Sequence, residues 1–193
     1  MVPTWVLAVS ALTLWGPFIG VLIWTSKQRG SGNFVHDFSL TFRAKDLWGV
    51  PLGVMSQLLL VIAVTLPFQW LLPDLFNSEA VEKRANELFD AAHGAWMFLL
   101  IFVVVICAPL VEEIVYRGFI QHNLGVAYGA RISVLLTSLW FAAVHLQLAE
   151  FPGLFAFSIV LGICFARTKR LGLSIVTHIA FNATAVTVMA LTR

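Results

Sequence analysis

The chain has 193 residues, of which 60% are hydrophobic and 11% are charged. Soluble domains carry about 45–50% apolar and about 25% charged residues, so this composition excludes an ordinary soluble domain and also a disordered chain. The formal net charge of +2 is too small to indicate a nucleic-acid partner. The sequence therefore predicts an all-α, polytopic bundle of transmembrane helices in a lipid bilayer.

Six apolar segments are predicted to be transmembrane helices, each of which needs about 20 residues. In chain order they cover residues 3–25, 47–72, 95 to beyond 112, 131–148, 153–167 and 171–191. The first segment lacks the basic start and the cleavage site of a signal peptide, so it is interpreted as a span. We expect one integral membrane domain over residues 1–193, with a core at about 95–191 and two additional helices within 1–94.

The charges between the predicted spans indicate an orientation. Basic residues follow the first span and separate the fifth from the sixth: Lys27, Arg29, Arg43, Lys45, Arg167, Lys169 and Arg170. The loop after the second span is mostly acidic, with Asp74, Glu79, Glu82, Glu87 and Asp90 against Lys83 and Arg84. Because basic loops stay in the cytoplasm, the sequence predicts that the N-terminus lies on the outer side of the membrane.

Small residues within the spans predict close packing. The pairs Gly16/Gly20 and Gly49/Gly53 are four residues apart, a spacing that lets two helices approach closely. The two cysteines, Cys107 and Cys164, lie in apolar runs and are interpreted as small core residues.

The first polar group inside the apolar segments is Glu112-Glu113-Ile-Val-Tyr-Arg117. A charged side chain at the bilayer centre costs about 2.5–3.5 kcal/mol on insertion scales, so such residues are rare unless they have a function. Glu113 and Arg117 share a helix face and are expected to pair. Glu112 is rotated by about 100° and has no basic residue three or four positions away, which favours a free carboxylate that can act as a base. The alternative is a helix end among the lipid headgroups.

Two further polar groups are Phe141/His145 and His178/Asn182, each four residues apart. Taken singly, His145 is better explained as a hydrogen-bonded packing residue. The His178/Asn182 pair is explained equally well by a hydrogen bond between helices or by a functional role. Together with Glu112 they supply a base, two imidazoles and an amide donor, which are the groups needed to activate a water and stabilise an oxyanion. Glu112, His145 and His178 also form a plausible zinc set with an open fourth position.

The order EExxxR, FxxxH and HxxxN on three helices resembles the CPBP family, the CAAX-protease and bacteriocin-processing (Abi) intramembrane proteases related to the type II CAAX prenyl endopeptidase. The resemblance implies catalytic roles for Glu112, His145, His178 and Asn182, and supporting roles for Glu113, Arg117 and Phe141. It implies hydrolysis of a peptide bond in a membrane-associated peptide or protein by a water that Glu112 and His145 activate. No cofactor is required in that mechanism, although zinc is the alternative.

Two other functions fit the same residues. The small chain could be an inactive scaffold or an accessory subunit of a larger membrane complex, with the polar cluster kept for packing. Intramembrane Glu and His residues also serve proton relays and transporters, but the sequence lacks their inverted repeats and paired broken helices.

The depths of Glu112 and His145 are a difficulty for the catalytic interpretation. In ideal perpendicular spans the two residues would lie roughly 15 Å apart along the membrane normal. We expect the third helix to continue through Glu112 to about residue 123, and the short fourth and fifth helices to tip inside the bilayer.

Overall fold

The computed structural model describes residues 4–77, 86 and 94–192, and within these residues the regular structure is entirely helical. In chain order the elements are α1 (Thr4–Arg29), α2 (Phe34–Asp37), η1 (Ala44–Trp48), α3 (Gly49–Met55), η2 (Ser56–Leu60), α4 (Val61–Leu71), α6 (Ala95–Phe102), η3 (Val103–Cys107), α7 (Ala108–Glu113), η4 (Ile114–Gln121), α8 (His122–Tyr128), α9 (Ala130–Val144), α10 (Phe151–Thr168) and α11 (Gly172–Leu191). Element η1 is a 3-10 helix, and η2, η3 and η4 are π-helical. The predicted all-α class is confirmed.

Several of these elements join into longer helices. In the part of the chain described, four helices are long and apolar enough to cross a membrane: Ala44–Leu71, Ala95–Tyr128, Phe151–Thr168 and Gly172–Leu191. Helix α9 is apolar but has 15 residues. The chain is a polytopic integral membrane protein. Six spans and an external N-terminus stay predictions, and Glu79, Glu82, Lys83, Arg84, Glu87 and Asp90 of the acidic loop lie outside the described residues.

Two predicted helix boundaries need correction. The fourth helix, predicted over 131–148, ends at Val144, because Leu146 has a positive φ of 54° that a right-handed helix does not allow. Helix α10 then begins at Phe151, with Pro152 in its first turn. The third helix is longer than expected and reaches Tyr128.

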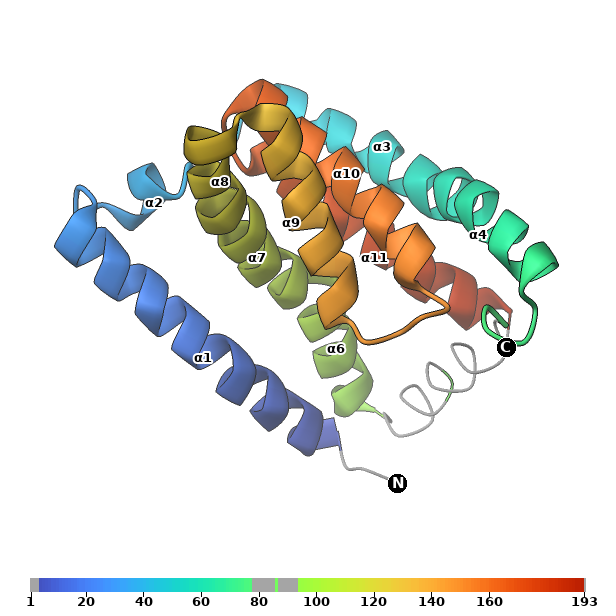
Figure 1. The fold of residues 1–193 in the computed structure, drawn as a ribbon. Coiled ribbons are helices and arrows are strands. Elements are labelled where there is room, and N and C mark those ends of the chain that lie inside the picture. Colours follow the sequence, from blue (N-terminus) through green and yellow to red (C-terminus); the bar gives the residue numbers. More distant parts are fainter. Residues whose placement is uncertain (1–3, 78–85, 87–93, 193) are drawn as a thin grey trace.

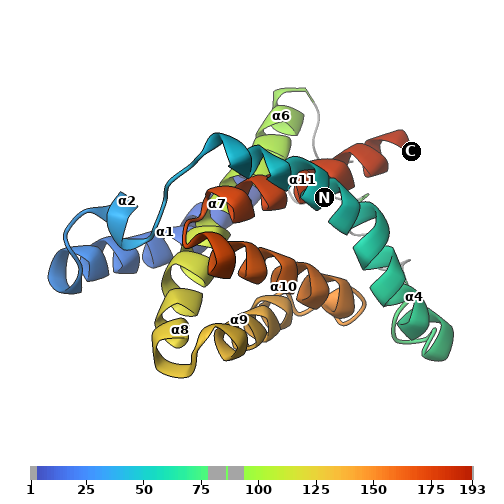
Figure 2. The same ribbon diagram turned by 90° about the horizontal axis from the view of Figure 1, so that it is seen from above.

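Helix α11 lies at the centre of the bundle. Figure 1 shows α1 at one edge and α3 with α4 at the opposite edge, and Figure 2 shows α11 between α3 and α10. A Cβ on Gly53 would lie 2.3 Å from the Thr177 carbonyl oxygen, so the backbones of α3 and α11 touch as the Gly49/Gly53 spacing predicts. The same prediction for Gly16 and Gly20 is wrong, because a Cβ on either would have nothing within 4 Å among the described residues.

Polar contacts at the end predicted to face the cytoplasm fix the start of α11. The Asp46 carboxylate accepts the backbone N–H of Arg43 at 2.7 Å and pairs with the Arg170 guanidinium. The Leu171 N–H donates to the Ser39 carbonyl at 2.9 Å. The turn before α11 is therefore tied to the segment before α3.

A second polar cluster joins α1 to α2. Asp37 accepts the Ser26 hydroxyl at 2.5 Å and the Ser31 hydroxyl at 2.7 Å. These hydrogen bonds, that of Ser26 foremost, hold the pKa of Asp37 well below its ordinary value. The loop after the first helix is thus closed by a carboxylate that is ionised at neutral pH.

The outer surface is apolar, as a bilayer requires. Trp48 and Trp70, at the two ends of helix Ala44–Leu71, are 74% and 83% exposed, which suits side chains at the membrane interface. Cys164 is buried and Cys107 half-buried, and neither forms a disulfide, in agreement with their interpretation as small core residues.

Candidate active site

The motif-bearing glutamates lie on a long helix with two π-helical segments. Glu112 is near the middle of the 34-residue helix Ala95–Tyr128, and α7, which carries both glutamates, lies between η3 and η4. The expected continuation of this helix through Glu112 is confirmed, and it places Glu112 far from either helix end. Single π turns inside α-helices occur frequently at functional sites.

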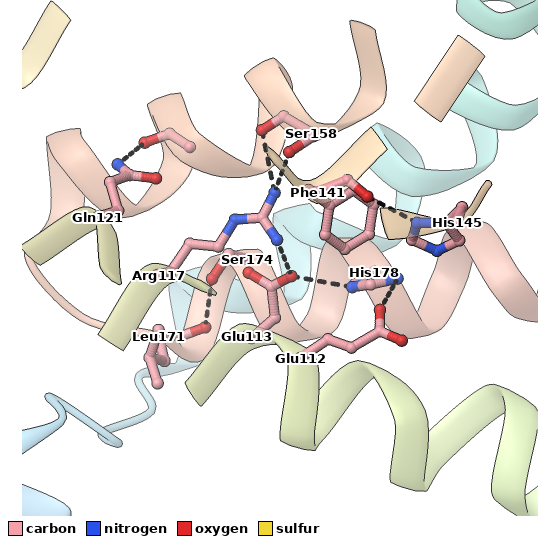
Figure 3. Close-up of polar contacts among 11 residues, drawn as sticks. Glu112, Glu113, Arg117, Gln121, Phe141, His145, Ser158, Leu171, Ser174 and His178 are labelled. Atoms are coloured by element: carbon pink, nitrogen blue, oxygen red, sulfur yellow. Dashed lines mark hydrogen bonds and ion pairs between the residues drawn. The ribbon is translucent and has the colours of Figure 1, made fainter. Parts of the chain in front are cut away.

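Glu113 and Arg117 form the pair that their spacing predicts. Arg117 Nη1 donates to Glu113 Oε1 at 2.9 Å, and both side chains are fully buried. Arg117 Nη2 donates to the Ser158 hydroxyl at 2.7 Å and to its carbonyl at 3.1 Å. The guanidinium carbon also lies 4.9 Å from the Phe141 ring centroid. Arg117 therefore joins η4, α9 and α10 around one buried charge (Figure 3).

His178 lies between the two glutamates. Its Nδ1 is 2.9 Å from Glu113 Oε1, and its Nε2 is 3.7 Å from Glu112 Oε2. The expectation that Glu112 has no basic partner is thus wrong, because the partner comes from α11 and not from its own helix. The Glu112 side chain is 26% exposed whereas that of Glu113 is fully buried, so Glu112 is the carboxylate that a small molecule can reach.

The hydrogen bonds define which protons His178 carries. An ionised Glu113, paired with Arg117, can only accept, so Nδ1 of His178 holds a proton and donates it. A second proton on Nε2 makes His178 an imidazolium, and the four groups Glu112, Glu113, Arg117 and His178 then have no net charge. Moving that proton to Glu112 leaves the cluster equally neutral.

His145 lies beside this cluster, at the C-terminal end of α9. Its Nδ1 is 2.7 Å from the Phe141 carbonyl oxygen, which can only accept, so Nδ1 is protonated and a neutral His145 keeps an open lone pair on Nε2. The buried Phe141 ring is 4.8 Å from the His145 ring and 6.0 Å from the His178 ring. Figure 3 shows both imidazoles and Glu112 gathered next to Phe141.

Asn182 faces a different part of the same long helix. Its Nδ2 donates to the Val104 carbonyl at 2.9 Å, two turns before Glu112. The hydrogen bond between helices that was the alternative interpretation of the His178/Asn182 pair is therefore present.

The residues that could hold a metal do not assemble into a ligand set. Among the described residues no group of three or more His, Cys, Asp or Glu side chains is placed to hold an ion. Glu112 and His178 approach each other, but His145 does not complete a three-ligand site with them.

Sequence reasoning missed three residues that support the site. The Ser158 hydroxyl accepts a hydrogen bond from Arg117, and the Phe157 and His178 ring centroids lie 5.4 Å apart in a T-shaped arrangement. Gln121 donates to the Gly162 carbonyl at 2.8 Å. The spacing Glu113, Arg117, Gln121 was a readable signal, since residues four apart share a helix face. A serine in the apolar run of α10 was a weaker one.

Comparison with known proteins shows which family the chain resembles. The family model described as type II CAAX prenyl endopeptidase Rce1-like matches residues 94–184, which include every predicted site residue. The membrane-embedded CAAX protease MroQ of Staphylococcus aureus (strain USA300) is 28% identical over 142 residues, which cover 70% of this chain and 53% of that protein. Over residues 94–184 the chain is similar to the CPBP family of intramembrane proteases. It spans about half the length of the curated relative that it matches. No solved structure matches the chain.

The similarity to these proteases also supports a location for the chain in the cell. The helices long and apolar enough to cross a membrane make the chain an integral membrane protein, and its bacterial relative supports the cytoplasmic membrane as its location.

Proposed function

We propose that the chain is an intramembrane endopeptidase that hydrolyses a peptide bond with a water activated by Glu112 and His145. The observation that carries the proposal is the placement of His178 between a fully buried, Arg117-paired Glu113 and a partly accessible Glu112. Such a buried, charge-balanced set is costly in an apolar bundle, which favours a catalytic role over packing alone.

In the proposed reaction the ionised Glu112 and the open Nε2 of His145 take a proton from water. The water oxygen attacks the scissile carbonyl carbon, and the protonated Nε2 of His178 donates to the oxyanion that forms. The family resemblance assigns Asn182 as a second donor. Glu112 then passes its proton to the leaving amine as the C–N bond breaks, so no covalent intermediate with the protein is needed.

The proposed step needs one of the two protonation forms in which Glu112, Glu113, Arg117 and His178 together carry no net charge. With Glu112 ionised and His178 doubly protonated, the base and the oxyanion donor are both ready. Glu113 keeps His178 in that orientation, because its carboxylate holds the Nδ1 proton at 2.9 Å. A metal is not required in this scheme, and the steps use the side chains of the chain itself.

The substrate that we propose is a membrane-associated peptide or a small membrane protein. The site lies within apolar helices, so a peptide bond must reach it from the bilayer or its surface. The matched relative is named a CAAX protease, which supports a peptidase that acts at the membrane. A bacterial source, which the relative's organism supports, makes a prenylated substrate less favoured.

The test compares wild type, Glu112→Gln and Asp74→Asn in liposomes that contain a diverse set of membrane-associated peptides. Mass spectrometry detects the products. Gln keeps the shape of Glu112 but cannot accept a proton, whereas Asp74 is an exposed carboxylate away from the cluster. We expect cleavage by wild type and Asp74→Asn and a loss of at least about 100-fold in Glu112→Gln. A chelator arm reports metal dependence.

The opposite outcome favours the accessory-subunit function. If wild type cleaves nothing in a broad set, or Glu112→Gln cleaves as well as wild type, the peptidase proposal is wrong. The proteins that co-purify with the chain from its native membrane would then be the next object of study.

A further inference from the structure

One carbonyl of the helix that carries Glu112 has lost its normal partner. In η3 the Ala108 N–H donates to the Val103 carbonyl, five residues back, as in a π turn. The next carbonyl, that of Val104, would then need the N–H of residue 109. Residue 109 is a buried proline, which has no N–H. A buried carbonyl without a partner is unfavourable, so this position needs a donor from elsewhere.

Helix α11 supplies that donor through Asn182, whose Nδ2 lies 2.9 Å from the Val104 oxygen. One turn earlier on α11, His178 contacts both glutamates. Helix α11 thus contacts the long helix at two places, at Glu112 with Glu113 and at the π turn two turns before Glu112. Asn182 is half-buried, so its hydrogen bond is largely sheltered from competing solvent.

We propose that Asn182 is a positioning residue. It stabilises the π turn before Glu112 by donating to the Val104 carbonyl, which has no backbone donor because Pro109 lacks an N–H. A π turn adds one residue to the helix, so its loss would rotate the following residues by about 100°. That rotation would turn the Glu112 carboxylate away from His178. This bond uses one of the two N–H groups of the Asn182 amide, so the positioning role stands beside the donor role proposed above, and only its consequence for catalysis rests on the proposed function.

Pro109 provides the means to separate this role from direct oxyanion binding. In Asn182→Leu the Val104 carbonyl has no donor, whereas Pro109→Ala restores a backbone N–H that can bond it. We expect Asn182→Leu to lower the melting temperature of the full chain in detergent by about 3 °C or more. Pro109→Ala should recover most of that loss in the double variant and have little effect alone.

The matched control is Thr184→Val, also on α11. The Thr184 hydroxyl bonds the Ala180 carbonyl within its own helix. Its substitution should therefore give the same change in melting temperature with and without Pro109→Ala. A Pro109→Ala effect confined to the Asn182→Leu background is the expected signature of the shared carbonyl.

Peptide cleavage in liposomes gives the second readout. We expect kcat to fall in Asn182→Leu with KM little changed, and to recover at least about 10-fold when Pro109→Ala is added. If the melting temperature does not recover, the bond is not the reason for the asparagine, whatever the activity. If it recovers and kcat does not, the bond stabilises the fold without orienting Glu112, and the positioning role is wrong. If wild type itself cleaves nothing, the proposed function fails, and the melting temperatures still test the bond.

Discussion

Replacing Arg117 with methionine tests how the buried charges are held. The side chains of Arg117 and Glu113 are fully buried, 2.9 Å apart, and the guanidinium also donates to two oxygens of Ser158 and lies over the Phe141 ring. Methionine fills much of the same space but leaves the Glu113 carboxylate without its cation. Removing one partner of a buried ion pair costs about 3–5 kcal/mol. For a chain of this size that predicts a fall in melting temperature of roughly 6–20 °C.

A thiol-reactive dye provides the assay, because Cys164 is buried and Cys107 half-buried in the folded chain. We expect Arg117→Lys to fall between wild type and Arg117→Met, since an ammonium group cannot reproduce the fork that bonds two partners at once. The double variant Glu113→Gln, Arg117→Met carries no unpaired charge and should recover more than half of the loss.

Two results would refute this reasoning. One is an Arg117→Met variant that melts within about 3 °C of wild type, which would mean that the carboxylate is neutral or solvated without the arginine. The other is a double variant less stable than Arg117→Met alone, which would mean that the Glu113 carboxylate stabilises the fold without the arginine, through its contact with His178.

Two further predictions concern the scaffold. Gly53→Ala should lower the free energy of unfolding by about 1–3 kcal/mol and lower the proposed peptidase activity, because its Cβ would meet the Thr177 carbonyl and displace the turn that carries His178. The control is Gly20→Ala, where a Cβ has nothing within 4 Å. Equal melting temperatures for the two variants would contradict the prediction. Asp37→Asn should destabilise the chain near pH 7. Because serine hydroxyls depress the pKa of Asp37, the difference in stability from wild type should shrink as the pH falls below about 4. A stability difference that stays constant down to about pH 3 in thermal melts would rule out the charge as its cause.

The part of the site that the sequence predicted correctly depends on local geometry. Glu113 and Arg117 are four residues apart, and this spacing brings them together on any helix, including the π-helical segment that follows Glu113. The Gly49/Gly53 contact is of the same kind, because the small residues open one face of a helix to whatever neighbour packs there.

The part that sequence reasoning missed depends on where another helix lies. Nothing in the 3.6-residue period places His178 against Glu112, because that contact depends on how far α11 approaches the long helix and on the π turns before and after α7. The end of α9 was missed for a related reason: the positive φ of Leu146 arises from the turn into α10 and has no marker such as glycine in the sequence.

The two adjacent glutamates contact the two nitrogens of one imidazole ring. Adjacent residues on a helix point about 100° apart, so Glu112 and Glu113 can approach one ring from two directions, and the two nitrogens of His178 face different carboxylates. Glu113, neutralised by Arg117, fixes the ring and its Nδ1 proton. Glu112 has no such cation on its own helix, is partly exposed and lies 3.7 Å from Nε2, so in the proposed reaction it is the carboxylate placed to exchange a proton. A single carboxylate could not both hold the ring and exchange a proton with it, which is the physical reason for two adjacent acids at a position where each is costly.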